Sequence, residues 1–217
     1  MSGHSKWATI KRDKGANDAK RGAIFTKLGN AITIAVRQGR GLDLAIEKAK
    51  AANMPKDNIQ RALDRAASKT EGNLAEALFE GFGPGGVAII IETISDNNTR
   101  TAQALHQVFT KHNCTLGTPG CVAYLFSRVG KIENTTFEEA VSVDALDFED
   151  GNLYTKPEDL HRVSQALGKP GNLIYKPNKE TMIEIKDAET SQKLQALLEA
   201  IDELDDVQNI SVSKFKT

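Results

Sequence analysis

Lysine and arginine side chains are concentrated in the first third of the chain. Residues 1–69 hold 15 Lys and Arg against 6 Asp and Glu, a net charge of +9, whereas the complete chain of 217 residues carries −1. The rest of the chain therefore carries −10, and a difference of this size bears on binding partners rather than on the fold. The expected partner of the first part is a polyanion, with nucleic-acid phosphates as the ligand. The cations that we expect to contact phosphate are Lys6, Lys11, Arg12, Lys14, Lys20, Arg21 and Lys27.

The only tryptophan, Trp7, stands among these cations. An aromatic ring in a basic segment can stack on an unpaired base, which makes Trp7 a candidate nucleic-acid-binding residue. It can equally anchor a terminal segment to a hydrophobic core, because an indole offers a large apolar surface. The two interpretations predict different outcomes for Trp7→Ala, and we favour anchoring.

A glycine-rich segment, GFGPGG at residues 81–86, matches the G-x-G-x-x-G pattern of dinucleotide-binding sites. Such a site needs a helix directly after the glycines, since the amides at the helix N-terminus receive the pyrophosphate. Here the β-branched segment VAIIIETI at residues 87–94 follows instead, and Pro84 lacks an amide proton. We therefore interpret the glycines as a tight turn leading into a strand.

Four side chains that commonly bind metals, His106, His112, Cys114 and Cys121, lie close together in the sequence. Their spacing does not provide the two close pairs of a zinc site, and we expect both cysteines to be reduced. The chain contains no G-x-S-x-G, H-E-x-x-H or P-loop motif. We therefore predict no catalytic, cofactor-binding or metal-binding residues, and no enzymatic activity.

The basic part of the chain has the pattern of three short helices. Apolar residues recur at spacings of three and four in residues 17–38 and again in 42–53, and glycines 39 and 41 separate the two segments. Met54-Pro55 ends the second helix and begins a third, since proline disfavours a helical residue before it but suits a first turn. We expect a bundle that buries its apolar faces and leaves the cations outside.

The remaining sequence mixes strands with helices. One strand–helix–strand succession is expected at residues 87–94, 99–111 and 122–126. Another is expected at 182–185, in a helix that runs through Leu194 and Leu204, and at 207–212. The two successions can form one sheet with helices on one face, a ferredoxin-like α+β arrangement. The segment between them has its own strand and helix signals. We thus predict an α+β protein with a helical domain (1–75), a discontinuous ferredoxin-like α+β domain (76–128 and 179–217) and a small inserted α+β domain (129–178).

No apolar run approaches the roughly 20 residues that span a bilayer, so no membrane association is expected. The first residues, MSGHSKWATIKRDKG, lack the apolar stretch of a secretory signal. The sequence is therefore typical of a cytoplasmic protein.

Five blocks in this order resemble the YebC/PmpR family, and the resemblance covers nearly the whole chain. The blocks are MSGHSKWATI (1–10), DAKRG with FTKL (18–28), KAKAANMPKDNI (48–59), FEGFGPGGV (79–87) and LDDVQN (204–209). The resemblance implies three domains, the first helical and the others α+β, around a cleft. It also implies a DNA-binding transcriptional regulator without enzymatic activity, since bacterial members are so described, whereas mitochondrial and some bacterial members act as translation activators at the ribosome.

The resulting expectation is a cytoplasmic, non-enzymatic regulator of transcription that binds DNA through its basic N-terminal domain. The alternative is a translation activator that binds RNA on the ribosome, because phosphate contacts alone do not distinguish the two nucleic acids. A remote alternative is a small-molecule enzyme that uses the interdomain cleft. The acidic remainder is expected to contact a protein partner or to set the orientation of the molecule.

Overall fold

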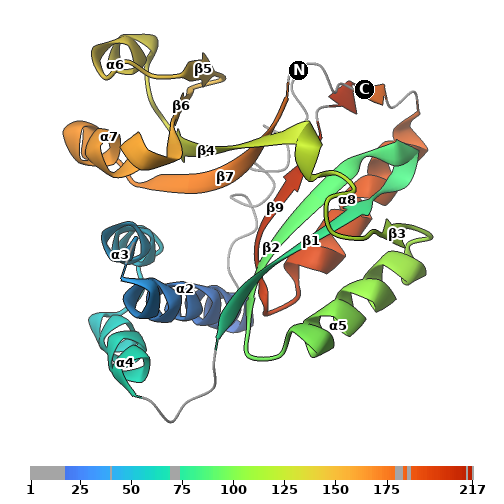
Figure 1. The fold of residues 1–217 in the computed structure, drawn as a ribbon, viewed down its shortest axis with the longest axis horizontal. Helices are drawn as coiled ribbons and strands as arrows, with labels where there is room; N and C mark the ends of the chain where they lie inside the picture. The colour runs from blue at the N-terminus through green and yellow to red at the C-terminus, as the bar shows by residue number, and fades with distance from the viewer. Residues whose placement is uncertain are drawn as a thin grey trace.

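The structure is a computed structural model that describes residues 18–39, 41–68, 74–178, 183–184, 187–213 and 215–216. It confirms the α+β class, with three helices first and two four-stranded antiparallel sheets after them. The described chain has three parts. The N-terminal bundle is residues 18–68, the inserted unit is residues 126–177, and the central unit is the first sheet with its two covering helices (Figure 1).

The N-terminal bundle contains α2 (Asp18–Gln38), α3 (Leu42–Ala51) and α4 (Lys56–Ala67). Gly39 and Gly41, with φ of 65° and 73°, turn the chain between α2 and α3 in the left-handed region that glycine adopts without strain. The bundle core is small and rich in alanine. It consists of Ile32, Ala35, Ala45, Ala49, Met54, Ile59 and Ala62, with Phe25, Leu28, Leu42, Ile46 and Leu63 packed around it.

One arginine takes part in holding the bundle together. The Arg65 guanidinium of α4 donates to Asn30 Oδ1 at 2.9 Å and to Thr33 Oγ1 at 3.0 Å, both on α2. Thr33 is buried, and its hydroxyl also donates to the Gly29 carbonyl at 2.9 Å. Arg65 therefore serves the packing of α4 on α2.

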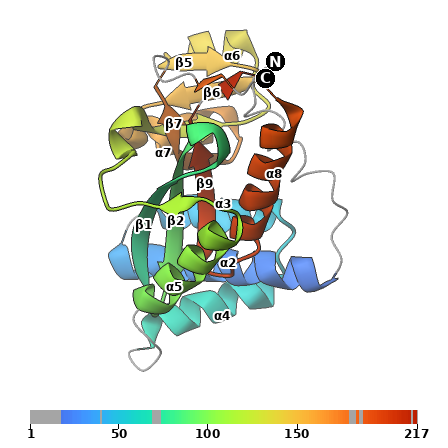
Figure 2. The same cartoon turned by 90° about the vertical axis from the view of Figure 1, so that its right-hand side faces the viewer.

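The central unit begins with a hairpin of β1 (Ala75–Phe82) and β2 (Ala88–Ser95), and its sheet has the order β3-β1-β2-β9. Helices α5 (Asn98–Lys111) and α8 (Ala188–Asp202) cover one face of this sheet (Figure 2). Phe109 of α5 and Leu197 of α8 pack there on Ile89. The edge strands are β3 (Thr115–Leu116) and β9 (Val207–Val212), and β8 (Ile183–Glu184) pairs separately with β10 (Phe215–Lys216).

The opposite face of the same sheet is also covered. Ala88 and Ile90 pack there against Val122 and Phe126, with Tyr175 of the inserted unit beside them. Burial of both faces of β2 explains why the sequence of this strand is almost continuously apolar. The glycine-rich segment forms the turn of the β1–β2 hairpin, with the 3₁₀ turn η1 (Pro84–Gly86) at its tip, so the interpretation as a turn is confirmed.

The prediction of a strand at residues 122–126 is wrong. Residues Ala123–Leu125 form a 3₁₀ turn, η2, and the strand β4 begins only at Phe126. The cause is Glu80 of β1, whose buried carboxylate accepts hydrogen bonds from the amides of Gly120 (2.6 Å), Val122 (2.7 Å) and Ala123 (2.8 Å). These amides bind a side chain and are not available to a sheet ladder. Burial alone would raise the pKa of Glu80, but the three amides outweigh it and lower that pKa.

The inserted unit has its own sheet, of order β5-β6-β4-β7. Its helices cover one face, where Leu160 and Val163 pack on Ile132 and Leu153. The boundary expected after residue 128 falls inside β4, so this sheet begins three residues earlier. The elements are β4 (Phe126–Ile132), α6 (Phe137–Ser142), β5 (Asp147–Glu149), β6 (Asn152–Thr155), η3 (Pro157–Asp159), α7 (Leu160–Leu167) and β7 (Gly171–Pro177).

Candidate nucleic-acid interface

The structure describes only some of the residues that we predict to bind phosphate. Lys6, Trp7, Lys11, Arg12 and Lys14 lie outside the described residues, and Lys20 is placed only as part of the backbone of α2. Arg21, in the first turn of α2, is exposed.

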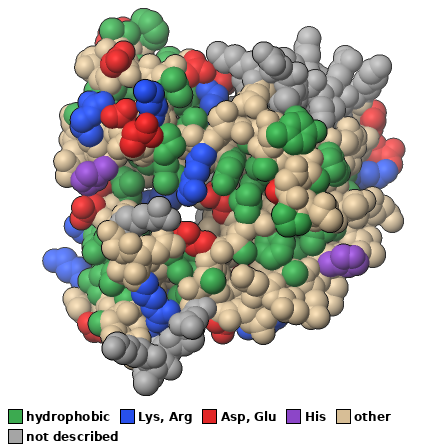
Figure 3. Space-filling model, viewed as in Figure 1, with side chains coloured by type: hydrophobic (Ala, Val, Ile, Leu, Met, Phe, Trp, Pro, Cys, Tyr) green, Lys and Arg blue, Asp and Glu red, His purple; other side chains and the backbone are tan. Residues whose placement is uncertain are grey.

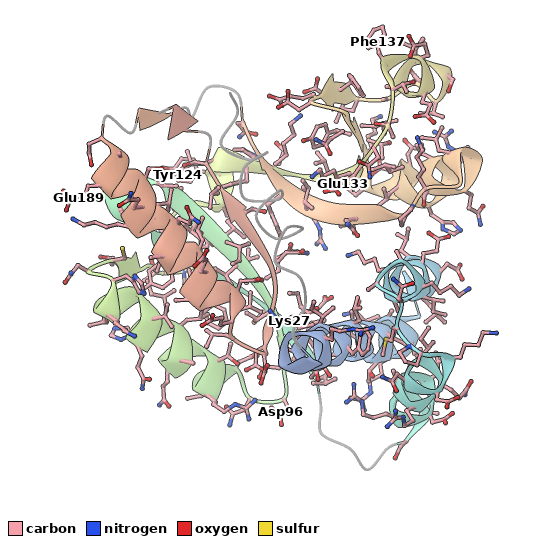
Figure 4. All side chains as sticks on the ribbon, turned by 180° about the vertical axis from the view of Figure 1, so that it is seen from behind. Lys27, Asp96, Tyr124, Glu133, Phe137 and Glu189 are labelled. Carbon is pink, nitrogen blue, oxygen red and sulfur yellow. The ribbon has the colours of Figure 1, made fainter. Side chains whose placement is uncertain are left out.

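Lys27 connects the N-terminal bundle to the central unit. Its side chain is only 16% exposed, and Nζ donates to the Asp202 carbonyl at 2.6 Å and lies 3.7 Å from Asp202 Oδ1 (Figure 4). Asp202 is the last residue of α8, where free carbonyls give the helix end a partial negative charge that attracts a cation. The structure thus turns the Lys27 ammonium toward the protein.

Helix α3 attaches the same bundle to the inserted unit. Leu44 packs at the edge of that unit's core, and the Ser164 hydroxyl of α7 donates to Glu47 Oε2 at 3.3 Å. Asp43 lies 3.9 Å from His161 Nε2. With α2 and α3 docked in this way, α4 is the outermost helix of the bundle (Figures 1 and 2).

Exposed cations remain on all three helices of the bundle. Arg21 of α2, Lys50 of α3, and Lys56 and Arg61 of α4 are exposed. None of the four forms an ion pair with any residue that the structure describes. A phosphate contact was predicted from the sequence for Arg21 but not for the three others. The signal that includes them is the net charge of residues 1–69, which extends well beyond Lys27.

Cations of the central and inserted units have a different environment, because most of them face carboxylates of their own unit. Lys176 is the most enclosed, with Nζ at 2.9 Å from Asp147 Oδ2, 3.5 Å from Glu149 Oε2 and 3.4 Å from the centre of the Tyr154 ring. The other pairs are Arg100 with Asp96 and Asp206, Lys131 with Glu133, Arg162 with Asp159, Lys169 with Glu139 and Lys193 with Glu189.

Charged residues also meet at the junction of the three parts, where the surface is hollowed (Figure 3). Glu92 of β2 lies there, within electrostatic reach of Lys48 of α3, Arg128 of β4 and Glu76 of β1. Burial raises the pKa of Glu92, while the cations and the amide of Asn209, which donates to Oε2 at 3.2 Å, act against that rise. Gln38 of α2 donates to Glu76 Oε2 at 3.0 Å and so brings the bundle to the same junction.

Comparison with known proteins decides the family. Residues 5–69 match the model described as the N-terminal domain of the TACO1/YebC protein, and residues 74–213 match the model for its second and third domains. The chain belongs to the TACO1/YebC family. The two matches meet between α4 and β1, where the helical bundle gives way to the first sheet.

Family members of known sequence and structure are similar over nearly their whole length. A protein of Persephonella marina is 43% identical over 97% of this chain and 94% of its own, and one of Rubrobacter xylanophilus is 44% identical over the same shares. Both are described as probable transcriptional regulatory proteins. The crystal structure of the conserved hypothetical protein Aq1575 from Aquifex aeolicus superposes with a TM-score of 0.87 at 39% identity, covering 97% of this chain and 96% of that one.

The four candidate metal ligands of the sequence do not converge. In the described part of the chain, no group of three or more His, Cys, Asp and Glu side chains is arranged to hold a metal ion. The Cys114 thiol donates to the His112 carbonyl at 3.2 Å, and burial raises its pKa, which disfavours the reactive thiolate. No helix among the described residues is long and apolar enough to cross a membrane.

Proposed function

We propose that this member of the TACO1/YebC family is a non-enzymatic regulator of transcription that binds DNA through the cations of its N-terminal bundle and the basic segment before it. The observation that carries the proposal is the contrast in ion pairing. Exposed cations of the bundle face no carboxylate within ion-pair distance in the described chain, whereas most cations elsewhere do.

An unpaired, exposed cation keeps most of its electrostatic field, and it gains the most from a phosphate because binding releases the counterions condensed on the nucleic acid. A lysine already held by a carboxylate has to break that pair first. The bundle and its preceding segment are therefore the part of the chain suited to a polyanion. The description of the relatives as probable transcriptional regulatory proteins supports DNA as that polyanion.

Phosphate contacts position a protein on nucleic acid without reading its sequence. We therefore assign phosphate binding to Lys6, Lys11, Arg12, Lys14, Lys20 and Arg21, and extend it to Lys50 and Lys56. Lys27 takes the structural role given by its contact with Asp202. We assign base reading to no residue, and Trp7 is the one candidate for base stacking.

The test is a salt titration of duplex-DNA binding by the full chain, followed by fluorescence anisotropy. If four to six cations reach phosphates, log K falls against log salt with a slope of about −4 to −5, at roughly −0.9 per contact. Lys11→Glu with Arg12→Glu then flattens the slope by about two units, and weakens binding to all sequences to a similar extent. A slope near zero on every nucleic acid would contradict the proposal.

A second measurement separates DNA from ribosomal RNA. Promoter fragments and random duplexes are compared with ribosomes in co-sedimentation at moderate salt. Preference for promoter DNA supports transcriptional regulation. Equal binding of promoter and random DNA, with ribosome co-sedimentation that the Lys11→Glu/Arg12→Glu variant loses, would replace it with a role in translation.

A further inference from the structure

The inserted unit exposes an apolar patch at the end of the molecule. Six large hydrophobic residues of the described chain are exposed, and three of them lie within ten residues, namely Phe137 (63%), Val141 (65%) and Leu146 (59%). Phe137 and Val141 are one turn apart on α6, so their side chains lie on the same face of that helix. Clusters of exposed apolar side chains with a polar rim mark interaction sites, whereas isolated ones are common on any protein.

The patch is held in place from behind. Ala140 of α6 is buried in the core of the inserted unit, and its carbonyl accepts from the Ala145 amide at 3.0 Å, which closes the turn at the end of α6. The Leu146 amide then donates to the Tyr154 carbonyl of β6 at 2.8 Å. The ring of Phe137 lies edge-on to that of Phe148 with centroids 6.0 Å apart. A capping box of Thr136 and Glu139 fixes the start of α6. These contacts make the patch a preformed surface.

The surroundings of the patch are acidic. Residues 133–155 contain seven Asp and Glu and no Lys or Arg. Lysines outside this segment pair with four of the seven acids, as described above. The three others, Glu138, Asp144 and Asp150, are exposed and form no ion pair with any residue that the structure describes. Glu138 follows Phe137 directly, and Asp144 lies between Val141 and Leu146 in sequence.

The patch lies far from α4, the outermost helix of the bundle that we propose for nucleic acid. Phe137 projects from the outer side of α6, and α4 of the bundle lies at the opposite end of the molecule (Figures 1 and 4). In the space-filling view, hydrophobic atoms reach the surface at the α6 end with acidic atoms beside them (Figure 3). A partner on α6 therefore leaves α4 accessible.

We propose that Phe137, Val141 and Leu146, with Glu138 and Asp144 at their edge, form the docking site for a cationic amphipathic helix of a protein partner. The apolar residues match a helix with apolar side chains at spacings of three and four, and the unpaired carboxylates select lysine or arginine beside them. A nucleic acid does not fit this surface, because its phosphates would meet Glu138 and Asp144. The chain thereby joins a nucleic acid at one end to a basic protein at the other.

The probe for this site is a fluorescent synthetic helix of leucine and lysine, about 14 residues long, with leucines along one face. Anisotropy with the full chain is compared for this peptide, a scrambled peptide of the same composition and a peptide with glutamate in place of lysine. The proposal predicts binding of the first, at least about tenfold weaker binding of the second, and none of the third. Equal binding of the first two peptides would overturn it.

Variants locate the peptide on the surface. Val141→Ser with Leu146→Ser, and separately Glu138→Lys with Asp144→Lys, are each expected to weaken peptide binding about tenfold or more. The controls are Tyr124→Ser, which removes another exposed hydrophobic residue, and Glu158→Lys with Glu203→Lys. The second control makes the same charge change at exposed positions that form no ion pair with any described residue. Melting temperatures show that each variant is folded, and unchanged DNA affinity of the patch variants keeps this test separate from the proposed function.

Two other occupants of the patch give distinct results. If a second copy covers it, sedimentation shows self-association that Val141→Ser with Leu146→Ser abolishes, without added peptide. If the basic N-terminus of the chain covers it, Lys11→Glu with Arg12→Glu raises the peptide affinity. Either result would overturn the proposal, as would equal loss of peptide binding in the patch variants and their controls.

Discussion

The exposed lysines of the N-terminal bundle and the enclosed lysines of the inserted unit have opposite electrostatic environments. In the inserted unit, Lys176 is enclosed by Asp147, Glu149 and the ring of Tyr154, and Lys169 is held by both oxygens of Glu139. In the bundle, Lys50 and Lys56 are exposed and face no carboxylate of the described chain. Carboxylates of the inserted unit neutralise Lys169 and Lys176, so the charge of these lysines stabilises the fold. The charge of Lys50 and Lys56 remains available to a ligand.

The largest expected effect tests whether exposed lysines bind DNA because they lie in the bundle. Lys50→Glu with Lys56→Glu should weaken duplex-DNA binding roughly 30- to 100-fold at moderate salt, because two phosphate contacts are lost and two repulsions are added. The matched control is Lys111→Glu with Lys156→Glu, which changes the net charge equally. Lys50 and Lys111 both lie in the last turn of a helix, and Lys56 and Lys156 both lie at the start of one.

The control variant should bind DNA within about threefold of the unchanged chain, because its two lysines lie outside the bundle. Thermal unfolding of both variants separates loss of binding from loss of structure. Equal weakening by the two variants would mean that net charge alone governs the affinity, and the contrast between the regions would have no functional meaning.

A second prediction concerns stability in the inserted unit. Lys176→Ala should lower the free energy of unfolding by about 2 kcal/mol, since it removes the ion pairs of Lys176 with the half-buried Asp147 and Glu149 and the contact with the Tyr154 ring. DNA affinity should stay unchanged. Lys193→Ala is the comparison, because its pair with Glu189 is exposed and its loss should hardly move the melting temperature. Urea unfolding of both variants would show whether enclosure makes the difference.

Glu80 gives a smaller, pH-dependent effect from a carboxylate held by amides alone. Glu80→Gln should lower the free energy of unfolding by about 1.5 kcal/mol at pH 7, because a neutral amide replaces a charge that accepts three hydrogen bonds. The pKa of Glu80 is lowered in the folded protein, so its stabilisation is present above the ordinary value of 4.5 and lost as pH falls through the folded value. Urea titrations at pH 7 and pH 3 should therefore show a smaller difference in the free energy of unfolding between the unchanged chain and the variant at the lower pH. A constant difference would assign the effect to packing.

Residues close together in sequence were predicted well, and residues brought together by the fold were not. The three helices of the bundle and the strand at 87–94 have patterns that local periodicity detects, because each buries a defined face. The strand β1, AEALFEGF, was missed since its burial is uneven and small residues interrupt it. In the sequence, nothing distinguishes Lys27 from the other cations of the bundle. Its partner Asp202 is 175 residues away along the chain, and only the fold brings the two together. The same limit applies to Glu80 and its three amides, which lie about 40 residues apart.

The smallest effect is expected at Glu92, which lies where the two compared regions meet. Its pKa is raised by burial, so the charged form is disfavoured in the folded protein despite Lys48 of the bundle and Arg128 of the inserted unit. A raised pKa means that stability is gained as pH falls through the folded value, and at pH 7 the carboxylate is a small cost. Glu92→Gln, which keeps an acceptor for the Asn209 amide, should therefore raise the free energy of unfolding by less than about 1 kcal/mol at pH 7, and the difference should vanish in acid. Destabilisation by this substitution would instead show that Lys48 and Arg128 hold the carboxylate as an ion pair, and that Lys48, like Lys27, stabilises the fold.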